Sequence, residues 1–218
     1  MTGQNQVGVN QMGQYPVNLV VDGRRCLVVG GGEVALRKVE GLLAAGAAVT
    51  VVAPQVDERI RRLPGVAVEE REYRRGDVAG YRLAIAATDA PGVNGAVYAD
   101  GEAAGVWVNG ADDPDHCSFT LPAVVRRGPL TVTVSTSGRS PALARWLRQR
   151  LEAEIGPEFE VLVDLLSSER DQLKLAGRST EGPGWQLALD SGMLDLIQTG
   201  DLTSARERLH ACLSSSSG

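Results

Sequence analysis

The sequence is poor in the residues that build metal sites, disulfide frameworks and membrane spans. It has only three cysteines, Cys26, Cys117 and Cys212, and two histidines, in no recognisable ligand spacing. This excludes a disulfide scaffold and provides no metal-binding motif. No run approaches the roughly 20 apolar residues of a membrane helix, and residues 1–14 lack the basic start and apolar stretch of a signal peptide. We therefore expect a cytoplasmic protein that binds neither a structural metal nor a membrane.

A basic charge balance is also missing. The chain has 22 Lys and Arg against 27 Asp and Glu, for a formal net charge of -5. Proteins that bind duplex nucleic acid need a basic face to displace phosphate counterions, so no nucleic-acid partner is expected. An anionic ligand would have to be held by a local basic cluster. With 218 residues, 43% of them hydrophobic, the chain can form one large domain or two small ones.

Residues 25–54 have the pattern of a βαβ unit. The apolar run 26–29 predicts a buried strand that stops at three glycines. Residues 33–45 place apolar side chains at helical spacing and end before Gly46, which predicts a helix with a glycine C-cap. Residues 49–52 predict a second strand, so strand, glycine turn, helix and strand follow one another within about 30 residues.

The alternation of strands and helices continues, and then the pattern changes. It indicates an α/β fold with a mainly parallel, Rossmann-type sheet at the N-terminus. After residue 112 it predicts a small α+β region and then a helical region. The further strands are expected at 66–68, 83–87, 106–108, 118–121 and 130–135, and the helical stretches at 140–155 and 159–213 with a break at 177–184.

Gly30-x-Gly32-x-x-Ala35 has the spacing of the dinucleotide-binding fingerprint. The first glycine permits a tight turn, the second lets the backbone approach a pyrophosphate, and the small third residue lets helix and strand pack closely. The pyrophosphate would lie at the helix N-terminus, where free N–H groups favour an anion. Gly30, Gly31 and Gly32 are therefore predicted to bind a cofactor. The alternative is a glycine turn that serves packing only.

The acidic residue that usually follows the second strand is absent. Pro54 and Gln55 stand there, and the nearest acid, Asp57, is expected in the first turn of a helix. The choice between NAD and NADP therefore stays open at this loop. Thr88 closes a predicted strand at the carboxyl edge of the sheet, where ligands of open α/β folds bind. It is expected either to contact the cofactor or to cap a turn or helix.

Asp112 is the predicted catalytic residue. Its loop follows the strand at 106–108 and so reaches the same edge of the sheet, where a carboxylate could act as a general base. The alternative is a solvated, Asp-rich turn. His116 lies close in sequence and is predicted to assist proton transfer or to contact a carboxylated substrate. Cys117 is read as a small buried apolar residue.

A second anion site is predicted where a strand joins a helix at Ser137, Gly138, Arg139 and Ser140. Hydroxyl groups, a glycine and an arginine converge there on a helix N-terminus, which suits a carboxylate or a phosphate. Ser140 followed by Pro141 also has the pattern of a helix cap, with Arg139 solvated. The residues alone leave both interpretations open.

Taken together, these motifs resemble one family over about residues 15–155. The chain is similar to precorrin-2 dehydrogenase, the NAD-dependent part of siroheme synthases, which occurs alone or together with sirohydrochlorin ferrochelatase activity. The segments that carry the resemblance are Tyr15–Val17, Val28–Ala35 with Arg37 and Lys38, Val49–Pro54, Ala86–Asp89, Asn109–Pro114, Ser118 and Phe119 with Pro122, and Ser137–Ala144.

The resemblance implies a function and a set of residues. It implies oxidation of precorrin-2 to sirohydrochlorin with NAD as hydride acceptor, within siroheme and porphyrin biosynthesis. Asp112 would be the key aspartate, and Glu33, Val34, Pro54 and Gln55 would contact NAD. It also implies a homodimer, with residues 113–155 as the dimerisation and substrate region. The Rossmann domain would cover 15–112 and the C-terminal helices 156–213, between tails at 1–14 and 214–218.

Two further hypotheses accompany this one. The same pocket could insert Fe²⁺ into sirohydrochlorin as a ferrochelatase (a lyase), because a carboxylate can take up pyrrole protons as the metal enters. A contrasting class is a non-catalytic NAD-sensing Rossmann module. Such a module would be expected to carry an acid after the second strand, and it would need neither the Asp112 loop nor the segment 137–144.

Overall fold

The computed structural model describes residues 13–215, which divide into two compact units at Leu121 and Pro122. Residues 1–12 of the predicted N-terminal tail and 216–218 of the C-terminal tail lie outside the described part. Gly13 and Gln14 have no regular secondary structure, and Ser214 and Ser215 belong to the last helix.

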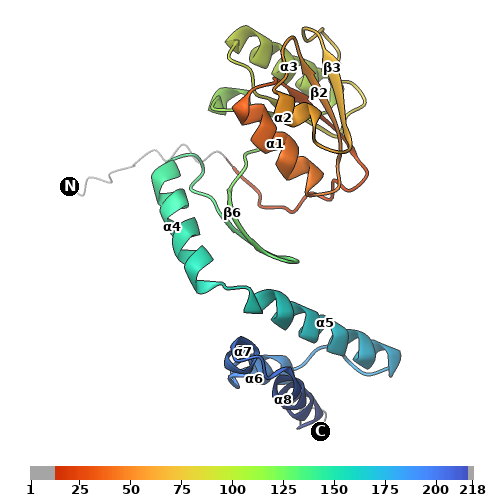
Figure 1. Ribbon diagram of the computed structural model, residues 1–218, viewed down its shortest axis with the longest axis vertical. Coiled ribbons are helices and arrows are strands. Elements are labelled where there is room, and N and C mark those ends of the chain that lie inside the picture. Colours follow the sequence, from red (N-terminus) through yellow and green to blue (C-terminus); the bar gives the residue numbers. More distant parts are fainter. Residues whose placement is uncertain (1–12, 216–218) are drawn as a thin grey trace, which may run out of the picture. The chain divides into compact units, whose positions relative to one another are not determined.

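The first unit is built on a five-stranded parallel sheet in the order β3-β2-β1-β4-β5 (Figure 1). This confirms the α/β fold with a Rossmann-type sheet. The strands are β1 (Arg25–Val29), β2 (Ala48–Ala53), β3 (Val66–Glu70), β4 (Leu83–Ala86) and β5 (Trp107–Gly110), and the helices are α1 (Glu33–Leu43), α2 (Glu58–Arg61), α3 (Pro91–Ala104) and the 3₁₀ turn η1 (Pro114–His116).

Helices cover both faces of this sheet because alternate residues of each strand point to opposite faces. In β1, Cys26 and Val28 belong to the core that includes α1 and α2, whereas Leu27 and Val29 belong to the core that includes Val97 of α3. Strands buried on both faces are expected to be apolar throughout, which explains the continuous run in β1.

The described part of the second unit, residues 122–215, contains a hairpin and five helices. Strand β6 (Ala123–Arg127) pairs antiparallel with β7 (Leu130–Val134) across a two-residue turn. Helix α4 (Pro141–Glu154) packs on this hairpin. The remaining helices share a separate hydrophobic core around Leu162, Met193 and Leu209, and they are α5 (Glu158–Leu175), α6 (Gly184–Leu189), α7 (Met193–Gln198) and α8 (Leu202–Ser215).

One predicted strand is wrong. Residues 118–121 form no strand, and the neighbouring Cys117 makes only an isolated bridge with Asn109. The Asn109 side chain donates to the Phe119 carbonyl at 3.0 Å, and Ser118 N–H donates to the Val108 carbonyl at 2.7 Å. Individual bonds to β5 therefore hold this segment in place of a ladder. No helix in the described part is long and apolar enough to cross a membrane.

Candidate dinucleotide and substrate site

The glycine turn after β1 has the tight geometry that its sequence predicts. Gly30 has a φ of 128°, and a Cβ there would lie 2.2 Å from the carbonyl oxygen of Ala87. A Cβ on Gly31 would lie 2.0 Å from the carbonyl oxygen of Gln55. Both positions therefore exclude any side chain, because the backbone of a neighbouring loop already occupies that space.

Gly32 differs from its two neighbours, because a Cβ there would meet nothing within 4 Å. It is the N-cap of α1, and no side chain caps this helix. The backbone N–H groups of the first helical turn are therefore available to another acceptor. The helix dipole favours an anion at this position. This open backbone cradle fits a dinucleotide pyrophosphate. Glu33, exposed, and Val34, half-buried, follow directly as the first residues of α1.

The loop after β2 lies against the same turn. Pro54 and Gln55 are exposed, and the Asp57 N–H donates to the Gly31 carbonyl at 2.8 Å. Asp57 was expected in the first turn of a helix. It is instead the N-cap of α2, where its side chain accepts a hydrogen bond from the Arg59 N–H at 2.8 Å.

An ion cluster joins this loop to α1. The guanidinium of Arg59 donates from Nη2 to Asp57 Oδ2 and to Glu33 Oε2, both at 2.6 Å. We call Glu33, Asp57 and Arg59 the Arg59 cluster. Hydrogen bonds from Arg59 lower the pKa of the Asp57 carboxyl from 3.8 to about 2, and the two carboxylates raise the pKa of the guanidinium. Sequence reasoning missed this cluster, because Arg59 and Glu33 are 26 residues apart.

Thr88 lies at the end of β4, and its bonds tie it to α3. Its hydroxyl donates to Asn94 Oδ1 at 2.7 Å, and Asn94 Nδ2 donates back to the Thr88 carbonyl at 2.9 Å. The hydroxyl also accepts from the Ala90 N–H at 3.2 Å. These contacts correspond to the turn alternative, because the N-cap of α3 is Ala90 and no side chain caps this helix. A cofactor contact by Thr88 stays a prediction.

Asp112 lies in the loop after β5, at the same carboxyl edge of the sheet as the glycine turn. Its side chain is exposed and its φ is 59°; Asp112 and Ser137 are the non-glycine residues with positive φ in the described chain. Such backbone conformations are costly and gather at functional sites. Both residues were predicted as site residues from sequence.

Lys38 is a residue whose role the sequence did not reveal. Burial and the neighbouring Arg37 lower the pKa of its ammonium group, and interactions with Asp112 and Cys117 partly oppose this. Lys38 lies on α1 and is half-buried, within electrostatic range of Asp112 and Cys117. The one sequence feature that pointed to Lys38 was its place, with Arg37, among the residues that carry the family resemblance.

His116 pairs with Asp113, the residue that follows Asp112. Its Nδ1 lies 2.7 Å from Asp113 Oδ2, and its ring makes an edge contact with Tyr98 of α3 at a centroid distance of 5.3 Å. Burial raises the pKa of the Cys117 thiol. The residue is half-buried, not fully buried as predicted, and its thiol donates to the Asp113 carbonyl at 3.2 Å. No described group of three or more His, Cys, Asp or Glu could hold a metal ion.

The turn of Ser137, Gly138, Arg139 and Ser140 belongs to the second unit. Ser137 has a φ of 52° and Gly138 a φ of 76°, and the turn is fixed by the Arg139 N–H bonded to the Thr136 carbonyl at 3.0 Å. Ser140 is the N-cap of α4, and its hydroxyl accepts from the Leu143 N–H at 3.3 Å. Arg139 is exposed. The cap interpretation therefore holds for Ser140, while anion binding at this turn stays a prediction.

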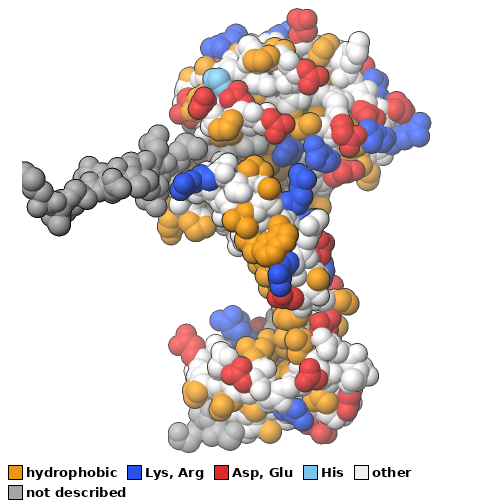
Figure 2. All heavy atoms as spheres, turned by 90° about the vertical axis from the view of Figure 1, so that its left-hand side faces the viewer, with side chains coloured by type: hydrophobic (Ala, Val, Ile, Leu, Met, Phe, Trp, Pro, Cys, Tyr) orange, Lys and Arg blue, Asp and Glu red, His pale blue; other side chains and the backbone are white. Residues whose placement is uncertain are grey.

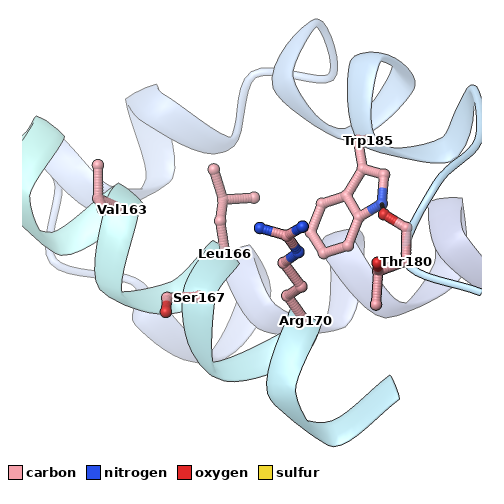
Figure 3. A pocket seen from close by; sticks show the side chains of 6 residues that line it. All are labelled: Val163, Leu166, Ser167, Arg170, Thr180 and Trp185. Carbon is pink, nitrogen blue, oxygen red and sulfur yellow. Dashed lines mark hydrogen bonds between the residues drawn. The ribbon is translucent and has the colours of Figure 1, made fainter. Parts of the chain in front are cut away.

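A cavity of about 400 Å³ opens between α5 and the segment leading into α6 (Figure 3). Figure 3 shows the Arg170 guanidinium beside the Trp185 indole and Leu166, and the indole Nε1 donates to the Thr180 carbonyl at 3.0 Å. None of the predicted site residues lines this cavity. It is a feature of the C-terminal helices alone.

Comparisons with known proteins match two parts of the chain. Residues 17–123 match a family model described as NAD(P)-binding, and residues 127–154 match one described as sirohaem biosynthesis protein central. Siroheme synthase of Chromobacterium violaceum is 40% identical over 206 residues, covering 89% of this chain and 43% of that protein. Siroheme synthase of Methylococcus capsulatus is 39% identical over 215 residues, covering 90% and 45%.

The chain thus spans less than half the length of these curated relatives. A solved structure titled SirC, precorrin-2 dehydrogenase, superposes with a TM-score of 0.69 at 26% sequence identity. The superposition covers 92% of this chain and 100% of that one.

Proposed function

Since this chain belongs to the family that comprises precorrin-2 dehydrogenase and the NAD-binding part of siroheme synthase, we propose that it oxidises precorrin-2 to sirohydrochlorin in siroheme biosynthesis. NAD is its cofactor. The observation that carries the proposal is that the predicted cofactor site and the predicted base lie at the same edge of the sheet. The uncapped glycine turn after β1 and the Asp112 loop after β5 both lie at the carboxyl ends of the parallel strands. The comparisons give no support to the NAD-sensing module.

The oxidation removes a hydride and a proton from the macrocycle. Bound NAD supplies the hydride acceptor. The chain's own task is to take the proton, and we assign this role to the exposed Asp112 carboxylate. A positioned general base contributes about 10²- to 10⁴-fold to a rate. Asp112 also interacts electrostatically with Lys38 of α1.

The substrate carries several carboxylates, so it needs basic groups on an acidic protein. The turn at Ser137 to Ser140 supports such binding, because Arg139 is exposed at the start of α4. A guanidinium can hold a carboxylate with two hydrogen bonds. His116 is proposed as a further contact, with Asp113 fixing the orientation of its ring.

Two observations support a homodimer in which residues 113–155 form the interface. The β6–β7 hairpin is a two-stranded sheet whose outer edges have no strand partner in the described chain, and an unpaired strand edge can pair with a strand of another chain. Helix α4 exposes Leu143 and Trp146, at 46% and 51%, and Figure 2 shows hydrophobic side chains gathered on its outer face. A second copy would cover both.

Iron insertion is a second candidate function. The curated relatives are named siroheme synthases, and siroheme is the iron complex of sirohydrochlorin. Asp112 could take up the pyrrole protons that Fe²⁺ displaces. In this activity Fe²⁺ is a substrate. Incubation of the protein with sirohydrochlorin and Fe²⁺ tests it, and a metal-insertion rate no faster than without protein would reject it.

The dehydrogenase is tested by NADH formation from precorrin-2 and NAD. For Asp112→Asn we expect kcat to fall by about 100-fold or more, while the dissociation constant for NADH changes little. Asp115→Asn is the matched control, because it removes the same charge from an exposed position in the same loop. Loss of activity in the control to the same extent, or full activity in Asp112→Asn, would reject Asp112 as the base.

A further inference from the structure

The loop after β2 raises the question of how this protein tells NAD from NADP. In Rossmann folds an acid at the end of the second strand bonds the ribose 2′-hydroxyl, or a nearby arginine accepts the 2′-phosphate. Here β2 ends at Ala53 and is followed by the uncharged Pro54 and Gln55. Discrimination must therefore come from side chains that reach this place from elsewhere.

The Arg59 cluster is attached to the glycine turn from two sides. Asp57 is bonded through its N–H to the Gly31 carbonyl at 2.8 Å, and Glu33 is the first residue of α1, directly after Gly32. A Cβ on Gly31 would meet the carbonyl oxygen of Gln55 and the Cα of Val56, so the β2 loop lies close against this glycine. The cluster thus borders the turn that holds the pyrophosphate, on the side of the β2 loop where the adenosine ribose of a dinucleotide lies.

The arginine of this cluster is already engaged. Arg59 Nε lies 3.2 Å from each carboxylate oxygen of Asp57, and Nη2 lies 2.6 Å from both Asp57 Oδ2 and Glu33 Oε2. One guanidinium between two carboxylates leaves a net negative charge. A 2′-phosphate would have to displace a carboxylate from Arg59 and meet the repulsion of the other.

From this arrangement we propose that Glu33 and Asp57, by occupying Arg59, select NAD over NADP. A 2′-hydroxyl can donate to one of the carboxylates, whereas a 2′-phosphate is repelled. The proposal rests on the dinucleotide site of the proposed function. The proposal implies that Arg59 can bind the 2′-phosphate of NADP once Glu33 and Asp57 have lost their negative charges.

Binding of NADH and NADPH to the full chain, measured by calorimetry or by nicotinamide fluorescence, tests this without any turnover. Wild type is expected to bind NADH about tenfold or more tightly than NADPH. In the double variant Glu33→Gln with Asp57→Asn, the NADPH-to-NADH ratio of dissociation constants should fall by about tenfold. Adding Arg59→Ala should raise the ratio again, to a value between those of the double variant and wild type, because the freed guanidinium is gone while the two carboxylates that repel the phosphate are still missing.

Glu58→Gln is the matched control. Glu58 is an exposed acid on the same short helix and pairs with Arg61 and Arg62, not with Arg59. Its loss should leave the ratio unchanged. The preference of wild type should also weaken at about 1 M salt, where the Debye length is only about 3 Å, since the cluster is exposed at 58% for Arg59 and 62% for Glu33.

The outcomes separate this inference from the proposed function. Equal binding of NADH and NADPH by wild type, or an unchanged ratio in the double variant, would overturn the selection role while the dinucleotide site stands. A ratio that changes in Glu58→Gln as much as in the double variant would also overturn it. A chain that binds neither nucleotide would overturn both.

Discussion

Two helices begin at turns that the sequence marks as anion sites, and the structure completes them differently. Helix α1 starts at Gly32 with no capping side chain, so its first N–H groups are free for a ligand. Helix α4 starts at Ser140, whose hydroxyl already accepts the Leu143 N–H, and Pro141 has no N–H to offer. The first helix can bind an anion by its backbone, whereas the second must use a side chain such as Arg139.

Gly32→Ala is the sharpest test of this contrast. The added methyl group meets nothing within 4 Å of the protein, and φ at this position is -94°, so we expect the melting temperature to stay close to that of wild type. The methyl group would fill the space in which the pyrophosphate approaches the backbone. The NADH dissociation constant should rise about tenfold or more. Wild-type affinity in this variant would show that the turn serves packing only.

Arg139→Ala should act on the substrate and leave the cofactor alone. Loss of one charge-assisted contact to a substrate carboxylate is expected to raise KM for precorrin-2 by about tenfold, with NADH affinity unchanged. Arg145, exposed on α4, is the matched control for the same charge loss. Equal effects of Arg139→Ala and Arg145→Ala would mean general charge attraction, and the turn would have no special role.

Ser140→Ala should cost stability and little else. It removes the oxygen that accepts the Leu143 N–H, and loss of a serine N-cap costs about 1 kcal/mol. Urea unfolding followed by circular dichroism would measure this loss, with Ser140→Asp expected to recover it because aspartate is also a good cap. If Ser140→Ala instead abolished substrate binding at unchanged stability, the hydroxyl would be a ligand contact.

The smallest expected effect concerns acid stability at Asp57, the cap of α2. Its pKa is lowered from 3.8 in the unfolded chain to about 2 in the folded one, so the ionised form favours folding. This contribution is complete above pH 3.8 and is lost as the pH falls toward about 2. The urea midpoints of wild type and Asp57→Asn should therefore differ near pH 7 and converge in acid. A difference that persists unchanged at about pH 3 would contradict the lowered pKa.

Local patterns predicted the parts of the fold that depend on neighbours in sequence. The βαβ unit, the glycine turn and the Ser140-Pro141 helix start follow from strand periodicity, backbone freedom and capping, and each lies within the predicted segment. Strand 118–121 was wrong for a tertiary reason. Its residues have strand-like chemistry, but the bonds of Ser118 and Phe119 to β5 use side chains as well as backbone and form no ladder.

The site residues that sequence did not reveal are brought together by packing. Arg59 reaches Glu33 because the β2 loop is bonded to Gly31. Lys38 and Asp112 are far apart in sequence, and only the folded chain brings them into electrostatic range. His116 pairs with Asp113 because a 3₁₀ turn brings the two side chains together. The sequence of the Asp-rich loop did not predict this turn. Charge clusters of this kind carry no periodic signal, since a residue's partner depends on the folded topology.

The most direct test of the account is a crystal structure of the full chain with bound NADH. We expect the pyrophosphate within about 3.5 Å of the backbone N–H groups at Gly32 to Val34, and the Asp112 carboxylate facing the nicotinamide ring across the sheet edge. A dinucleotide bound away from the glycine turn, or an Asp112 side chain directed away from the nicotinamide, would contradict the central claim.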